Sequence, residues 1–151
     1  DPAIRSIRDY SALGFHDFVK DKIPVLGICL GMEMFFQQSQ EGKESGLDVM
    51  SGEVVLLPDT MKIPHMGWNN LEITNDSKIL EGVDNNSWVY FVHSYRAKPN
   101  DEKIIVANAD YGIKVPAVVE NGLFFGTQFH PEKSGKVGSL MIKNFLRVCT
   151  K

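Results

Sequence analysis

The chain has 151 residues, of which 43% are hydrophobic and 23% are charged, and its net charge is -3. This length supports one domain with a core, and this composition excludes a disordered chain. The weak negative charge, without a stripe of Lys and Arg, argues against a nucleic-acid or anionic-membrane partner. No apolar stretch is long enough to span a membrane. The two cysteines, Cys29 and Cys149, cannot form a disulfide framework, so we expect a reducing, cytoplasmic setting.

The first part of the chain predicts a helix, a buried strand and a second helix. Apolar residues recur at roughly helical spacing over residues 2–20, which predicts an amphipathic helix. The apolar run Val25–Ile28 is typical of a buried parallel strand. Helical spacing resumes after Gly31 and continues to Phe36. Residues 42–46 contain Gly and Ser and predict a loop.

The rest of the chain predicts a series of strands and a closing helix. The strands are expected at Glu53–Leu57, Trp68–Ile73, Trp88–Tyr95, Lys103–Asn108, Val115–Glu120 and Leu123–Phe129. The Asn121-Gly122 pair between the last two strands predicts a hairpin, because both residues tolerate positive φ. Apolar side chains from Val137 to Val148 follow a helical repeat. This order of elements predicts one α/β domain over residues 1–151, built on a mixed sheet.

The segment Gly27-Ile28-Cys29-Leu30-Gly31 has the pattern of a nucleophile elbow, a sharp turn between a strand and a helix. Its glycines leave room for a strained turn that lifts the cysteine above the sheet. The backbone N–H of Leu30 is then placed to stabilise an oxyanion, and the dipole of the following helix favours a thiolate. The alternative is a packed, unreactive thiol, because free cysteine is among the most buried residue types.

A thiol nucleophile needs a base, and the base needs a group that orients it. Of the four histidines, His130 ends a predicted strand and is followed by Glu132 two residues later. In extended geometry these two side chains share a face, so Glu132 could accept a hydrogen bond from the His130 ring. A solvated pair at a strand end is the competing interpretation. No Cys and His spacing suits zinc, so we predict no metal site and no cofactor.

Four segments together resemble the class I, or triad-type, glutamine amidotransferases. They are GICLGME at the elbow, PHMGWN at Pro64–Asn69, YFVHSYR at Tyr90–Arg96, and GTQFHPEKS around His130. Within that family they are most similar to the glutaminase subunits of imidazole glycerol phosphate synthases. The resemblance covers the chain from residue 1 onwards and implies a flavodoxin-like, doubly wound mixed sheet.

The resemblance also implies that the domain is N-terminally incomplete here. The family's sheet begins with strands that precede the helix predicted over residues 2–20. About two βα units, roughly 50–60 residues, have no counterpart in this sequence. They include the family's glycine-rich strand that faces the elbow and completes the oxyanion hole. If the molecule lacks them, we expect poor stability and no glutaminase activity.

The resemblance implies a mechanism in which Cys29 attacks the side-chain amide of L-glutamine, His130 acts as general base and then acid, and Glu132 orients the imidazole. The Leu30 N–H contributes to the oxyanion hole. The positions implied to bind substrate are Gly31, Glu33, Ser94 and Tyr95. The ammonia passes to a (β/α)₈-barrel cyclase subunit in histidine biosynthesis. The positions implied to face that partner are His65, Met66, Trp68, Tyr90 and Lys133.

Several of these residues have simpler interpretations when the resemblance is set aside. Ser94 and Tyr95 are then ordinary strand residues, and Lys133 is a solvated lysine. The large apolar residues predicted as core are Trp68, Trp88, Phe91, Phe124 and Phe125. Two functional alternatives also stay open. One is another class I amidotransferase, and the other is a catalytically silent, glutaminase-like docking module.

Glu33 departs from the family pattern, in which glutamine is usual at this position. It lies four residues after Cys29, so a helix that starts directly after the elbow places both side chains on one face. A carboxylate there would disfavour the thiolate and repel the α-carboxylate of bound glutamine. Alternatively, Glu33 points aside and is harmless.

Overall fold

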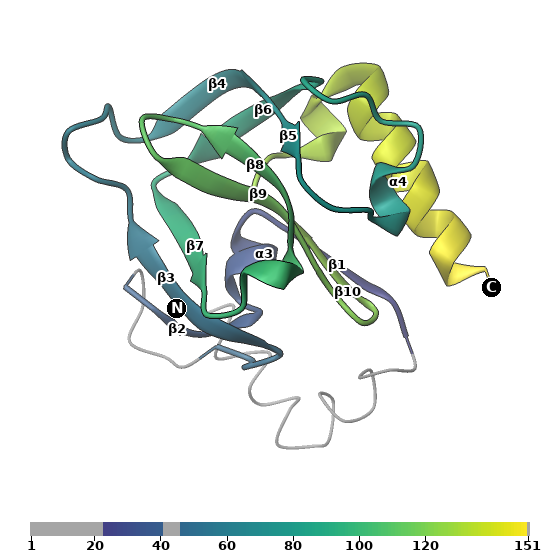
Figure 1. Ribbon diagram of the computed structural model, residues 1–151, viewed down its shortest axis with the longest axis horizontal. Coiled ribbons are helices and arrows are strands. Elements are labelled where there is room, and N and C mark those ends of the chain that lie inside the picture. Colours follow the sequence, from purple (N-terminus) through teal and green to yellow (C-terminus); the bar gives the residue numbers. More distant parts are fainter. Residues whose placement is uncertain (1–22, 41–45, 151) are drawn as a thin grey trace.

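The structure, a computed structural model, describes residues 23–40 and 46–150 (Figure 1). Its largest sheet contains, in spatial order, β1 (Val25–Ile28), β10 (Phe124–Thr127), β9 (Lys114–Asn121), β8 (Ile105–Asp110) and β5 (Glu72–Ile73). Strands β1 and β10 run parallel, and the other neighbours in this sheet run antiparallel. The mixed sheet of an α/β domain, predicted from the order of elements, is therefore confirmed.

Two smaller sheets flank this central sheet. One contains β2 (Phe36–Ser39), β3 (Met50–Leu56) and β7 (Tyr95–Pro99), and the other pairs β4 (His65–Asn70) with β6 (Trp88–His93). Figure 1 shows the β4–β6 ribbon at the top of the view and β2 and β3 at the lower left. The helices among the described residues are the one-turn α3 (Leu30–Glu33), the closing α4 (Gly135–Cys149), and the 3₁₀ turns η1 (Lys78–Leu80), η2 (Glu102–Ile104) and η3 (Pro131–Lys133).

Two apolar cores lie on opposite faces of the central sheet. Phe124 and Phe125 are neighbours in β10, so their side chains point to opposite faces. Phe125 belongs to a buried cluster that includes Phe129 and Met141 and that packs against the apolar side of α4. Phe124 belongs to a second cluster, with Met32 and residues of β2 and β3. Strand β10 is buried on both faces, so the position of the chain that leads from it to His130 is well defined.

The hairpin and the closing helix form as predicted, but the turn is one residue later than the predicted Asn121-Gly122 pair, because Asn121 still belongs to β9. Asn121 pairs with Phe124, so the loop consists of Gly122 and Leu123, and Gly122 has a φ of 61°. Helix α4 spans Gly135–Cys149. The helix predicted over 2–20 lies outside the described residues, as does most of the loop predicted at 42–46.

The helix predicted to continue to Phe36 is wrong beyond Glu33. A helix that continues to Phe36 would bond the Phe35 N–H to the Gly31 carbonyl, whereas this N–H donates to the Met32 carbonyl at 3.0 Å. Here the Met34 carbonyl accepts from Leu47, and the Phe35 carbonyl accepts from Val49 and Met50. Phe36 instead begins β2 and pairs with Met50. The apolar spacing of the segment serves the second core rather than a helix.

The strand boundaries and two core residues also differ from expectation. The stretch predicted as one strand over Trp68–Ile73 is divided between β4 and β5, and Trp88–Tyr95 is divided between β6 and β7. Phe91, Phe124 and Phe125 are buried as predicted, but Trp68 and Trp88 are 54% and 58% exposed. Both tryptophans lie on the outward face of the two-stranded β4–β6 ribbon, so their assignment to the core is wrong.

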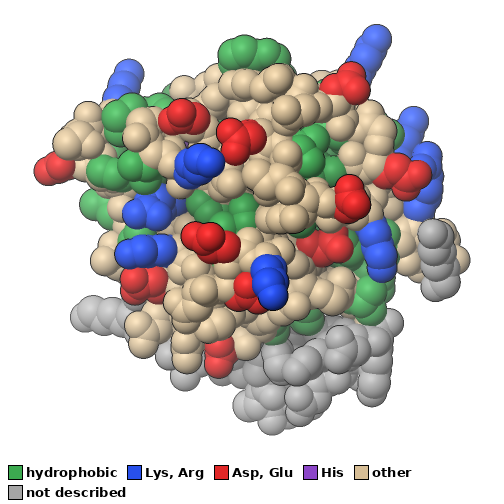
Figure 2. Space-filling model, viewed as in Figure 1, with side chains coloured by type: hydrophobic (Ala, Val, Ile, Leu, Met, Phe, Trp, Pro, Cys, Tyr) green, Lys and Arg blue, Asp and Glu red, His purple; other side chains and the backbone are tan. Residues whose placement is uncertain are grey.

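The surface carries both signs of charge. Figure 2 shows Lys and Arg side chains interspersed with Asp and Glu over the face that it views, without a stripe of either sign. Within the described part of the chain, no helix is long and apolar enough to cross a membrane.

Candidate active site

Cys29 lies at the turn between β1 and α3, with φ 54° and ψ -105°. A positive φ is strained for a residue other than glycine and needs support from its surroundings. Two backbone hydrogen bonds supply it. The Cys29 N–H donates to the Thr127 carbonyl at 2.7 Å, which extends the parallel β1–β10 ladder, and the Cys29 carbonyl accepts from Glu33 at 3.1 Å. The residue is thus tied to the strand and to the helix, which is the geometry expected of an elbow.

The two glycines of the elbow have different roles. A Cβ at Gly27 would lie 2.7 Å from the backbone of Gly31 and 2.7 Å from the ring of Phe35, whereas a Cβ at Gly31 would meet nothing within 4 Å. Gly27 therefore permits the close approach of α3 to the end of β1. Gly31, a predicted substrate-binding position, borders open space. Leu30 is the first residue of α3, so its N–H has no acceptor within the helix.

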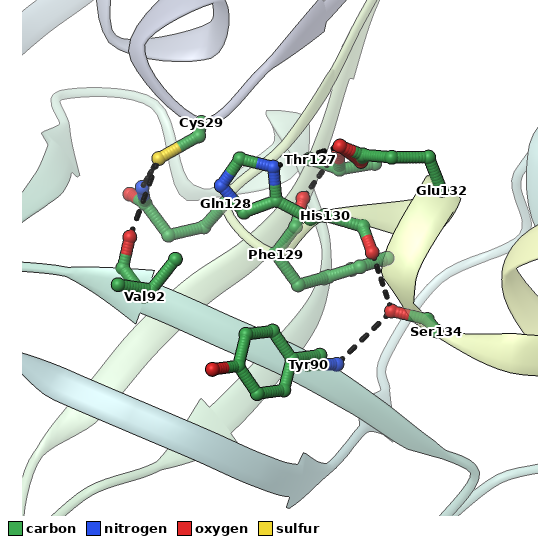
Figure 3. A network of polar contacts seen from close by, with 9 residues as sticks. All are labelled: Cys29, Tyr90, Val92, Thr127, Gln128, Phe129, His130, Glu132 and Ser134. Carbon is green, nitrogen blue, oxygen red and sulfur yellow. Dashed lines mark hydrogen bonds and ion pairs between the residues drawn. The ribbon is translucent and has the colours of Figure 1, made fainter.

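His130 and Glu132 contact each other, as predicted. The His130 Nδ1 atom lies 3.0 Å from the Glu132 carboxylate. The backbone between them is not extended, because Pro131 starts the 3₁₀ turn η3 directly after His130. A carboxylate oxygen accepts, so Nδ1 carries the proton and Nε2 of the neutral ring is left as the basic nitrogen. In Figure 3 the ring lies between the Cys29 sulfur and the Glu132 carboxylate.

Strand β6 holds the backbone of His130 in place. The His130 N–H donates to the Tyr90 carbonyl at 2.9 Å. The Ser134 hydroxyl accepts from the Tyr90 N–H at 3.0 Å and donates to the His130 carbonyl at 2.6 Å (Figure 3). Ser134 is buried and was not predicted as a site residue. Its role depends on β6, which is distant in sequence, so no local pattern could have indicated it.

The Cys29 sulfur has two further neighbours that the sequence did not indicate. The thiol donates to the Val92 carbonyl at 3.7 Å, and Nε2 of Gln128 lies 3.9 Å from the sulfur. The same Nε2 donates to the Glu33 carboxylate at 3.1 Å. Glu33 is 6% exposed. Its carboxylate is thus in the interior, and one amide connects it to the sulfur.

The remaining predicted substrate positions follow β6 directly. Ser94 lies between β6 and β7, and its carbonyl accepts from the Leu57 N–H at 2.9 Å. Tyr95 begins β7, and its carbonyl accepts from the His93 ring. Both side chains are half-buried. They lie two and three residues beyond Val92, on the segment that also contacts the sulfur.

Four of the five predicted partner-facing residues are accessible. Met66 and Trp68 are 62% and 54% exposed, Lys133 is exposed, and Tyr90 is half-buried. Met66 pairs with Val92 and Trp68 pairs with Tyr90 across the β4–β6 ribbon. His65 is different, because it is only 3% exposed. Its side chain points inward and does not contribute to that surface.

His65 and His93 form a directed chain of hydrogen bonds inside the ribbon. Nδ1 of His93 lies 2.6 Å from the Tyr95 carbonyl and must therefore donate. Nε2 of His93 then accepts from Nδ1 of His65 at 2.9 Å, and Nε2 of His65 accepts from the Asn69 amide at 3.3 Å. This arrangement needs both rings to be neutral.

The electrostatics of the histidine pair favour the neutral forms. Burial, with a smaller effect of His93, lowers the pKa of His65 to about 4. Burial also lowers the pKa of His93, and His130 lowers it further, while the hydrogen bond to the Tyr95 carbonyl opposes the shift. His65 is stacked between Phe91 and Tyr111, with ring centroids 4.5 and 3.9 Å away. Across the described ranges, no group of three or more His, Cys, Asp or Glu side chains is placed to hold a metal ion.

Comparison with known proteins identifies the family. The model of the class-I glutamine amidotransferase family matches residues 7–149. The sequence is 46% identical over 134 residues to "Imidazole glycerol phosphate synthase subunit HisH" of Methanocaldococcus jannaschii, covering 88% of this chain and 68% of that protein. It is 42% identical over 164 residues to the HisH subunit of Geobacillus kaustophilus, covering 99% and 77%. This chain belongs to the HisH family of class I glutamine amidotransferases.

Solved structures agree on the fold of this HisH family member. A putative GMP synthase protein from Thermoplasma acidophilum superposes with a TM-score of 0.64 at 20% identity, over 95% of this chain and 66% of that one. A glutamine amidotransferase from Thermotoga maritima superposes with a TM-score of 0.62 at 20% identity, over 93% and 54%. The class I amidotransferase fold and the family resemblance of the four sequence segments are therefore confirmed.

Proposed function

We propose that this chain is the glutaminase part of an imidazole glycerol phosphate synthase, which hydrolyses L-glutamine and passes the ammonia to a cyclase subunit in histidine biosynthesis. Relatives with the HisH name, at 42% and 46% identity, support the pathway. The observation that carries the chemistry is the strained Cys29, which lies beside the ring of the His130–Glu132 pair (Figure 3). We propose these three residues as the catalytic triad.

The proposed reaction begins when Nε2 of His130 takes the proton of the Cys29 thiol. The sulfur attacks the side-chain amide carbon of glutamine, and the carbonyl oxygen becomes an oxyanion, for which the Leu30 N–H is one donor. The C–N bond then breaks, His130 returns the proton to the leaving nitrogen, and ammonia and a γ-glutamyl thioester form. Water, deprotonated by His130, hydrolyses the thioester to glutamate. Acid–base help and an oxyanion donor each contribute roughly 10²–10³-fold or more in rate.

The thiol must change partner before this reaction starts. It donates to the Val92 carbonyl, and a carbonyl oxygen stabilises the protonated thiol rather than a thiolate. Rotation about the Cβ–Sγ bond that turns the S–H group toward the His130 ring would allow the proton transfer. Glu132 would keep the ring in the tautomer that has a free Nε2.

The outward face of the β4–β6 ribbon is the surface we propose for the cyclase subunit. It presents Met66, Trp68 and Trp88, each more than half exposed, and half-buried Tyr90. Contiguous exposed aromatic and Met side chains are typical of protein interfaces. The edge of β6 that is not paired with β4 holds His130 and Cys29 through its carbonyls. A partner on this ribbon would therefore lie one strand away from the site.

The decisive experiment measures glutamine hydrolysis by the full-length protein, with and without the cyclase and its ribonucleotide ligand. We expect strong stimulation by the partner and its loss in Cys29→Ala. Cys149→Ala is the matched control, because that thiol is exposed at the end of α4 and should be dispensable. Activity that needs no partner would indicate a different class I amidotransferase. A folded protein without activity under any condition would indicate a docking module.

A further inference from the structure

Gln128 lies between the end of β10 and His130, and its side chain is wholly buried. Its backbone N–H donates to the Ala117 carbonyl at 2.8 Å. The residues on either side are also buried, and the Thr127 hydroxyl donates to the Phe129 carbonyl at 3.0 Å. The side chain of Gln128 is therefore held in one direction by a closely packed segment. Figure 3 shows that it points toward the Cys29 sulfur.

The chemistry around the amide settles which of its atoms faces the sulfur. Glu33 Oε2 lies 3.1 Å from the amide nitrogen, and the sulfur lies 3.9 Å from it. A carboxylate oxygen accepts hydrogen bonds, so the amide nitrogen faces Glu33 and the sulfur. The flipped amide would place its own oxygen against the carboxylate oxygen, and the two would repel each other. A glutamine amide has two N–H groups, so one can donate to the carboxylate and the other to the sulfur.

The electrostatic setting makes the second N–H important. The ionisable groups near Cys29 are Glu33 from α3, which Gln128 links to the sulfur, and His130, with Glu132 behind its ring (Figure 3). His93 follows Val92, whose carbonyl accepts from the thiol, and its own ring bonds to Tyr95 and His65. Of these, Glu33 is a carboxylate 6% exposed on the same turn of helix. A buried negative charge near the sulfur disfavours a second one. Helix α3 has four residues, so its dipole offers little compensation.

We propose that Gln128 is a positioning residue for the nucleophile, which holds the Glu33 carboxylate with one N–H and the Cys29 sulfur with the other, and so allows a thiolate to form beside a buried carboxylate. The inference rests on the proposed role of Cys29 as nucleophile. The proposal assigns a function to Gln128, which belongs to the GTQFHPEKS segment but is not part of the His130–Glu132 pair. It also explains how this chain accommodates glutamate where its family usually has glutamine.

The test measures the rate of Cys29 alkylation by iodoacetamide as a function of pH. The full-length Cys149→Ala protein serves as the parent, because Cys29 is then the only thiol in this sequence. Gln128→Met keeps the length of the side chain and removes both N–H groups. We expect alkylation at pH 7 to fall about tenfold, a factor typical of a lost charge-assisted hydrogen bond, and its midpoint to move to higher pH. Adding Glu33→Gln should restore most of the rate, because the carboxylate is then absent.

Each outcome decides the proposal. An unchanged pH profile in folded Gln128→Met overturns it, and so does a loss of rate that Glu33→Gln fails to restore, because that loss would reflect packing alone. If Gln128→Met does not fold, Glu33→Gln by itself should move the midpoint to lower pH, and no movement overturns the proposal. Alkylation needs neither glutamine nor a partner. The expected shifts in a protein that never hydrolyses glutamine would therefore contradict the proposed function and leave the positioning role intact.

Discussion

At the scale of single residues, the site depends on a strained cysteine that its neighbours hold from two sides. Cys29 has a positive φ, which costs on the order of 1–3 kcal/mol. Its N–H belongs to the β1–β10 ladder, and its carbonyl belongs to the first turn of α3. At this turn the Gln128 amide lies 3.9 Å from the sulfur, and the His130 ring lies beside it (Figure 3).

The Glu33 position gives a kinetic prediction at the same scale. We expect Glu33→Gln to lower KM for glutamine or raise kcat in the assembled complex, because removal of the buried charge favours the thiolate and the α-carboxylate of the substrate. Gln128 can hold the new amide oxygen as it holds the carboxylate. Steady-state glutamine hydrolysis with saturating partner measures the effect. Kinetics identical to those of the parent would show that the carboxylate is harmless, the alternative that the sequence left open.

At the scale of elements, β6 connects the exposed face of the ribbon with the proposed catalytic residues. One edge of β6 pairs with β4 from His65↔His93 to Asn70↔Trp88. Its other edge offers the Tyr90 carbonyl to His130 and the Val92 carbonyl to the Cys29 thiol. A small displacement of this strand would change both contacts together. If the cyclase subunit binds the ribbon as proposed, this arrangement gives its binding a physical route to the site.

The β1–α3 elbow gives a prediction about packing. Gly27→Ala should destabilise the protein by about 1–3 kcal/mol, because the new methyl group would overlap the Gly31 backbone and the Phe35 ring. Gly31→Ala is the matched control, since a Cβ there meets nothing within 4 Å. Urea unfolding of both variants measures the difference. Equal stability of the two variants would show that α3 can move away from β1 at little cost.

At the scale of the whole molecule, two cores share one sheet, and the inward face of the β4–β6 ribbon packs on one of them through Val89 and Phe91. Phe124 and Phe125 place β10 between the cores. His65 and His93 join β4 to β6 with a hydrogen-bond chain that ends at the Tyr95 carbonyl. The packing inside this end of the ribbon therefore depends on the protonation of two buried rings.

Stability should accordingly depend on pH. The pKa of His65 is lowered from 6.5 to about 4, so the unfolded state binds the proton more tightly than the folded state. The contribution to stability is complete above about pH 6.5 and is lost as pH falls toward about 4, and a shift of this size corresponds to about 3 kcal/mol. The lowered pKa of His93 acts in the same direction. Urea midpoints at pH 7 and pH 5 measure the loss.

His65→Gln provides the control for this prediction. The variant cannot take up a proton at position 65, so it should be less stable than the parent at pH 7 and lose less between pH 7 and pH 5. Asp and Glu side chains ordinarily stay ionised between pH 5 and pH 7, so they contribute little to the change in stability over this interval. A loss equal to that of the parent would show that other groups dominate acid unfolding.

Much of the fold and half of the candidate site could be predicted from the sequence, because local patterns encode them. Gly27 beside Cys29 indicated the elbow, the closeness of His130 and Glu132 in sequence indicated their contact although a 3₁₀ turn rather than an extended backbone makes it, Gly122 indicated the hairpin, and the apolar repeat indicated α4. Each of these signals lies within a few residues of the structure that it specifies. Together they also indicated the family.

Only the tertiary structure decided which side chains meet across the fold. Phe36 enters a strand because Met50 pairs with it, although the apolar spacing before it fits a helix equally well. His65 lies inside rather than on the surface because His93, 28 residues away, accepts its hydrogen bond. Gln128 reaches Cys29 and Glu33 from 99 and 95 residues away. Such contacts depend on how strands are ordered in space, and local periodicity carries no information about that order.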